Sequence, residues 1–237
     1  LDAVARDESR PDAERAAAHR RVAELYLATG LIKHRPAAVE HLGEALRLDP
    51  GLFEAGRLRA GTAQRMGFDG RARRWYRDLC RDFPDDARAW QLRGRFHFQQ
   101  ARRLLDEDEL RRAAAAFARA VEVDSLDVVS RLGLGSTLLA LGWYDDAPGV
   151  LAPLLRHPER GREARLLHAA ALAGRGDEAQ AWQAFLEALQ GEDAATRALF
   201  LDGRGFLEES RQLEEAAAGL EPGLLEAALR RVDPRWE

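Results

Sequence analysis

The sequence predicts an all-α protein, built as a solenoid of about five to six antiparallel helix hairpins. Two observations carry this prediction. Similar segments recur along most of the chain at spacings of roughly 34 to 41 residues, the period range of helical-hairpin repeats. Glycine and proline also mark the ends of apolar helical segments at matching places, because glycine ends a helix and proline stops the next one.

The expected elements follow this punctuation in order. Residues 1–16 are predicted to form an N-terminal helical extension, residues 17–191 the repeats, and residues 192–237 a degenerate repeat and a C-terminal helix. The first hairpin turns at Gly30, the second at Gly67 and the fourth at Gly142, and a fifth, shorter unit runs through Gly174. One such hairpin cannot bury its apolar face alone, so neighbouring hairpins must stack.

Two hairpins carry extra residues. The first has about three, around Ile32 to His34, and the third about seven, including the acidic run 106–109. We expect both insertions to bulge from an edge of the stack, the acidic run as a solvated tip. The run lacks the alternating oxygen ligands and glycine of a calcium loop, so it does not predict a calcium site.

The fourth unit shows the repeat pattern best. It reads Leu134-Gly135, then large apolar residues, then Gly142-Trp143-Tyr144-Asp145-Asp146-Ala147. This pattern resembles the tetratricopeptide repeat (TPR) family, well over about residues 17–158 and poorly beyond. The resemblance implies a right-handed superhelix whose first helices line a concave groove that binds an extended peptide or a partner protein.

The resemblance also implies which residues line that groove. The expected partner-binding residues carry charge, amide hydrogen bonds and apolar contacts; they are Arg57, Gln64, Arg65, Arg88, Gln91, Arg95, Phe98, Leu132 and Leu139. A partner segment with acidic residues at one end and apolar residues at the other would complement this set. Lys33 is the only lysine and asparagine is absent, which disfavours the lysine–asparagine clamp by which some family members hold chaperone tails.

Self-association is the alternative function. Leu1 and Val4 place apolar side chains at one end of the sequence, and Trp236 places one at the other. The ends of a solenoid need polar caps, and a head-to-tail contact that does not close builds a fibre. The sequence also leaves open that these apolar groups fold back on their own hairpins, or that the chain is a non-catalytic domain of a larger protein.

Charge is unevenly distributed. Residues 51–105 hold 13 arginines against 6 acidic residues, whereas the whole chain has a net charge of -4. Nucleic acid is a disfavoured partner, because no basic helix is interleaved with exposed aromatic residues. No apolar run approaches the ~20 residues of a membrane span, and the arginine-rich composition suggests a soluble bacterial protein, cytoplasmic or exported.

No catalytic or cofactor-binding motif is found. The sequence has neither a nucleophile elbow nor a phosphate-binding loop, and its six histidines form no metal-binding pair, so no cofactor or metal is predicted. The single cysteine, Cys80, excludes an internal disulfide and is expected to be a small buried residue.

Overall fold

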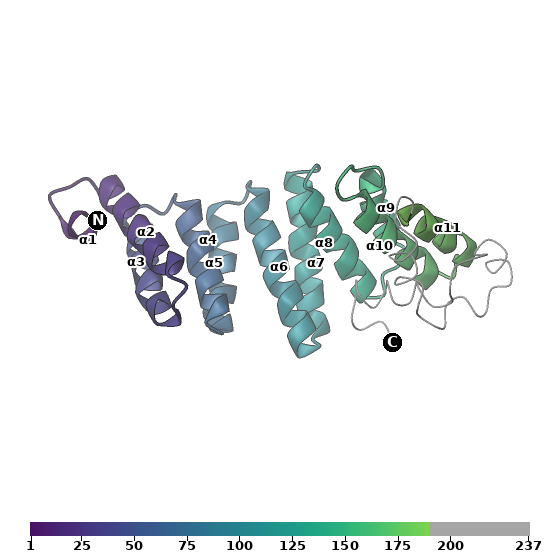
Figure 1. The fold of residues 1–237 in the computed structure, drawn as a ribbon, viewed down its shortest axis with the longest axis horizontal. Coiled ribbons are helices and arrows are strands. Elements are labelled where there is room, and N and C mark those ends of the chain that lie inside the picture. Colours follow the sequence, from purple (N-terminus) through teal and green to yellow (C-terminus); the bar gives the residue numbers. More distant parts are fainter. Residues whose placement is uncertain (190–237) are drawn as a thin grey trace. The chain divides into compact units, whose positions relative to one another are not determined.

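The computed structural model describes residues 1–189, which form helices and no strand. They fall into two compact units, one of residues 1–96 and one that begins at residue 97 (Figure 1). The first unit contains α1 (Asp2–Arg6), α2 (Asp12–Ala28), the 3-10 helix η1 (Ile32–His34), α3 (Arg35–Leu48), α4 (Phe53–Arg65), α5 (Asp69–Asp82) and the start of α6 (Ala87–Leu104). The second contains the end of α6, α7 (Glu107–Val123), α8 (Val128–Ala140), α9 (Ala147–Leu151), the 3-10 helix η2 (Ala152–Leu154), α10 (Gly161–Gly174) and α11 (Glu178–Ala188).

Consecutive helices pair as predicted. The described residues hold five consecutive hairpins, α2/α3, α4/α5, α6/α7, α8/α9 and α10/α11; in the third, the second-unit part of α6 contacts α7 where His97 meets Glu109. The all-α class and the hairpin organisation are therefore confirmed. The predicted sixth hairpin and the C-terminal helix, residues 192–237, lie outside the described residues.

Glycines with left-handed backbone turn four of these hairpins. Gly30, Gly67, Gly142 and Gly176 have φ values of 69°, 76°, 72° and 84°. After Gly67, the Phe68 amide donates to the Ala63 carbonyl at 2.9 Å, which satisfies a carbonyl that the end of the helix leaves unpaired. In the fifth hairpin Gly176 makes the turn, whereas Gly174 leaves room for the Tyr144 ring: a Cβ there would lie 2.5 Å from Tyr144 Cγ.

The third hairpin departs from the expectation at its insertion. The extra residues lengthen its helices, α6 to 18 residues and α7 to 17, against 13 in α4 and 14 in α5. Asp106 caps α7 by accepting from the Asp108 and Glu109 amides, and Leu105 takes the left-handed turn position with a φ of 53°. The predicted solvated tip was thus wrong at Glu109, whose side chain is buried beside His97 and Arg112.

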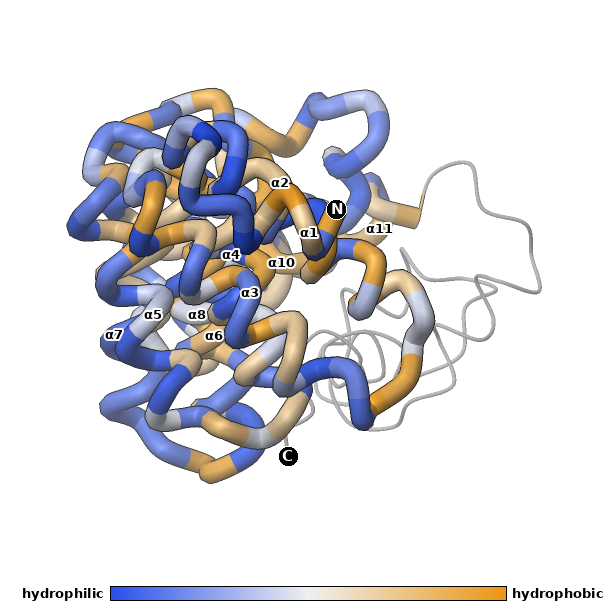
Figure 2. Tube along the Cα trace, turned by 90° about the vertical axis from the view of Figure 1, so that its left-hand side faces the viewer, coloured by the Kyte–Doolittle hydropathy of each residue, from blue (hydrophilic) through white to orange (hydrophobic). Residues whose placement is uncertain are grey.

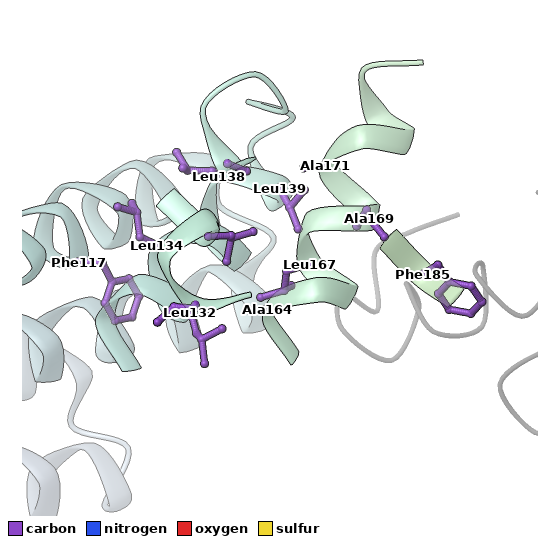
Figure 3. Close-up of a cluster of buried hydrophobic side chains, with 14 of the residues drawn as sticks. Phe117, Leu132, Leu134, Leu138, Leu139, Ala164, Leu167, Ala169, Ala171 and Phe185 are labelled. Atoms are coloured by element: carbon purple, nitrogen blue, oxygen red, sulfur yellow. The ribbon is translucent and has the colours of Figure 1, made fainter. Parts of the chain in front are cut away.

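Small residues bring the helices of each unit close together. In the first unit, Ala38, Leu42 and Ala45 of α3 are buried against Ala23 and Ala55. In the second, a larger apolar cluster joins α7, α8, α10 and α11, where Phe117, Leu138, Leu167 and Phe185 are among its members (Figure 3). Hydrophobic and hydrophilic stretches alternate along the helices (Figure 2), as one-sided burial requires.

Candidate protein-interaction surface

A buried tyrosine organises the polar surface of the first unit. Tyr76 of α5 is 5% exposed, and its hydroxyl donates to Gln64 Oε1 of α4 at 3.0 Å. Its ring lies 5.3 Å from that of Phe96 on α6. The hydroxyl therefore lies where α4 and α6 approach α5, and Gln64 is held in place by it.

Three arginines of the first unit act electrostatically on this hydroxyl, and we call them the Tyr76 arginine cluster: Arg57, Arg65 and Arg95. Burial raises the pKa of Tyr76, and the positive charges of all three arginines act in the opposite direction. The family resemblance implies that these three residues line one groove, and in the structure the charges of all three act on the same hydroxyl.

Only part of the cluster's charge is neutralised. Arg57 Nε donates to Glu54 Oε2 at 2.7 Å, and both side chains are half-buried. Arg65 donates to the Thr62 hydroxyl at 3.1 Å and forms no ion pair with a described residue. Arg95 is exposed and likewise has no ion pair within residues 1–189. The positive charges of Arg65 and Arg95 are thus not neutralised by any described acidic residue.

Arg88 is less available than the sequence suggested. Its guanidinium makes a bidentate contact with Asp86, in which Nη2 donates to Oδ2 at 2.6 Å and Nε to Oδ1 at 3.0 Å. This contact lowers the pKa of Asp86. The guanidinium also stacks 4.3 Å from the centre of the Phe53 ring. An acidic partner would have to compete with Asp86 for it.

The other expected groove residues lie in different surroundings. Gln91 is half-buried on the first-unit part of α6. In the second unit, Phe98 is partly buried against the apolar cluster, and Leu132 and Leu139 are each only 6% exposed within it (Figure 3). The structure therefore gives these two leucines a packing role, and we leave them out of the binding surface.

The residues predicted for self-association are only partly described. Leu1 is 58% exposed at the start of α1, and Val4 is half-buried. Trp236 lies outside the described residues. Other large apolar side chains are exposed in the first hairpin, among them Leu25 at 51% and Ile32 at 71%.

Three of the described histidines are engaged in structural contacts. His19 and His41 face each other with 2.9 Å between their Nδ1 atoms, and His97 Nδ1 lies 2.7 Å from Glu109 Oε2. No group of three or more metal-ligating side chains is found within residues 1–189. In the same part of the chain no helix is both long and apolar enough to cross a membrane. Cys80 is buried as expected, and burial raises the pKa of its thiol to about 11.

Paired helices, glycine turns and a polar surface on the first helices define a helical-repeat protein with the tetratricopeptide repeat fold, as the sequence predicted. No family profile matches the sequence, and no curated protein does so either.

Solved structures of TPR proteins match this fold. MamA has a TM-score of 0.63 at 18% identity, over 76% of this chain and 93% of MamA. YrrB, described as a TPR protein with an unusual peptide-binding site, has a TM-score of 0.58 at 15% identity, over 85% of this chain and 91% of YrrB. PilF of Pseudomonas aeruginosa has a TM-score of 0.58 at 19% identity, over 95% of each chain.

Proposed function

We propose that the chain is a non-catalytic protein-interaction scaffold that binds an extended acidic segment at the Tyr76 arginine cluster. The observation that carries this proposal is that Arg65 and Arg95 are exposed in the first unit and form no ion pair with a described residue. YrrB, which has the same fold, is described as having a peptide-binding site, and this supports a peptide as the ligand.

The charge pattern favours a carboxylate as the group recognised. Arg65 on α4 and Arg95 on α6 have no acidic partner among the described residues. Complementary charge accelerates encounter and fixes the register of the bound segment. Because the surface is exposed, binding should weaken as salt rises.

The test is a peptide titration followed by fluorescence anisotropy. The probe is a fluorescein-labelled peptide of three glutamates followed by three leucines. Replacing both Arg65→Glu and Arg95→Glu should weaken binding at least tenfold. The matched control is Arg74→Glu on α5, which reverses an exposed arginine outside the cluster. Equal losses in the control and the double variant, or none in either, would refute the proposal.

A second variant tests the role of neutralisation. Glu54→Gln removes the acceptor of Arg57 and should free its guanidinium for the peptide. We expect affinity to rise a few-fold. A fall in affinity would show that Arg57 acts only when Glu54 holds it in position.

Self-assembly is the second candidate function, favoured by the exposure of Leu1, Leu25 and Ile32. Scattered apolar residues are common on monomers, but contiguous patches mark interaction sites. Light scattering at increasing concentration tests it: assemblies should form and should dissolve in a variant with Leu1→Ser and Ile32→Ser. A concentration-independent monomer excludes this candidate.

A further inference from the structure

The second and fifth hairpins can be compared position by position. Both turn on a left-handed glycine, Gly67 and Gly176, and in both the first helix ends two residues before the glycine and the second begins two residues after it. Counting eight residues on from each glycine gives Trp75 in α5 and Ala184 in α11. The same place in two hairpins thus holds the largest side chain and one of the smallest.

In the second hairpin the indole fills that place. The Arg59 guanidinium lies 4.1 Å from the centre of the Trp75 ring, a cation–π contact. Burial lowers the pKa of Arg59, and Asp78 acts in the opposite direction. The cavity that remains beside them has a volume of about 170 Å³.

In the fifth hairpin Ala184 leaves the place open. A cavity of about 680 Å³ lies there, within the size range of ligand pockets. Its lining mixes apolar and polar side chains: Leu155, Leu172 and Ala184, with Arg156, Arg165, His168, Gln180, Gln183 and Glu187.

The charged groups around the two places also correspond. Counted back from the turn glycine of each hairpin, His168 occupies the position of Arg59. Counted forward from the same glycines, Glu187 occupies the position of Asp78. Burial and Arg175 lower the pKa of His168, while Glu187 acts to raise it. Burial thus disfavours the charged form of the imidazole, and Arg156 and Arg165 bring positive charge to the lining.

The Arg165 side chain is held in position on the lining of the cavity. Its Nη1 donates to the Leu155 carbonyl at 2.5 Å, and Gly161 leaves the room for this contact, since a Cβ there would lie 3.2 Å from Nη1. Its Nε is buried and has no hydrogen-bond partner. Arg59 Nε in the second hairpin is buried in the same way, so Arg165 is expected to act through the positive charge of its guanidinium on the cavity lining.

We propose that this cavity receives an aromatic side chain from a partner peptide, with a neighbouring carboxylate of the peptide held by Arg165 and Arg156. The aromatic group would fill the place that Trp75 fills in the second hairpin. The site belongs to the second unit and shares no residue with the Tyr76 arginine cluster, so it can succeed or fail independently of the proposed function.

The test uses the whole chain and a fluorescein-labelled peptide, Ser-Glu-Trp-Glu-Ser. We expect binding that is at least tenfold weaker when the peptide's tryptophan is replaced by alanine, or its glutamates by glutamine. Ala184→Trp should fill the cavity and weaken binding at least tenfold. Arg165→Gln should weaken it about tenfold, whereas the matched control Arg160→Gln, exposed and outside the lining, should bind normally.

Two further measurements, of folding and of the His168 resonance, apply even if a variant is unstable. Circular dichroism establishes folding of each variant. In the unaltered protein, the His168 Hε1 resonance should shift on peptide addition. An unshifted resonance, or full binding by folded Ala184→Trp, overturns the proposal. Loss of binding in the Arg65→Glu, Arg95→Glu variant would also overturn it, because the peptide would then occupy the first unit.

Discussion

Replacing Gly133 by alanine tests the close approach of α8 to α7. A Cβ at Gly133 would lie 2.7 Å from Cε1 and Cζ of Phe117, well inside the ~3.5–4.0 Å of a normal carbon contact. Phe117 is only 2% exposed within the second-unit cluster, so its ring has little room to move. Overpacking of this kind destabilises the fold by about 1–3 kcal/mol. Alanine also favours the helix more than glycine does, which stabilises the fold by up to about 1 kcal/mol. The net expectation for Gly133→Ala is a loss of about 1–2 kcal/mol.

Gly61→Ala is the matched control. Gly61 also lies inside a helix, α4, but its added Cβ would meet only Tyr76 Oη at 3.6 Å and Arg65 Nη1 at 3.8 Å, ordinary contact distances. Alanine there should stabilise by about 0.5–1 kcal/mol. Urea unfolding followed by circular dichroism measures both variants. Equal stabilisation by the two changes would refute the packing of Phe117 on Gly133; recovery of stability in Gly133→Ala with Phe117→Leu would support it.

Three further predictions concern buried polar groups. Burial, and then His41, lowers the pKa of His19; because the unfolded chain binds the proton more readily, stability should be full above pH ~6.5 and fall below it. Urea midpoints at pH 7.5 and 5.5 should differ, and less so in His19→Gln; equal differences in both proteins would exclude His19 as the cause. The Cys80 thiol, with its pKa raised from 9.0 to about 11, should react with a disulfide reagent at pH 8 about a hundredfold more slowly than after denaturation, and comparable rates would contradict its burial. Glu109→Ala should cost about 3–5 kcal/mol by leaving buried His97 without its carboxylate; a loss below 1 kcal/mol in urea unfolding would show that Glu109 does not anchor α7.

The sequence predicted the hairpins because each helix and each turn depends on residues that are close together in the chain. Left-handed backbone favours glycine at Gly30, Gly67 and Gly142, and the helices on either side follow from apolar spacing. The turn of the third hairpin could not be predicted in this way, because Leu105 adopts the left-handed conformation there although it is not a glycine. A run of acidic residues likewise suggested solvent, yet Glu109 is buried because His97, one helix away, accompanies it.

The candidate site was predictable in composition but not in charge balance. The family resemblance implies that Arg57, Arg65 and Arg95 line one groove, and the structure adds the buried Tyr76 hydroxyl on which their charges act. An arginine is available to a partner only if no neighbouring carboxylate already binds its guanidinium. Only the tertiary structure shows that Asp86 accepts hydrogen bonds from two nitrogens of Arg88.

The sequence by itself determined that this is an all-α chain of repeated hairpins. Helix formation, glycine turns and small packing residues each depend on a short stretch of sequence. The tertiary structure alone decided which side chains are accessible. The family resemblance implies that Leu132 and Leu139 line the groove, yet both lie in the core. Ala184 lines a cavity only because α10 and the residues after α9 surround it. Accessibility depends on which helices pack together, and that is fixed by contacts between segments distant in the chain.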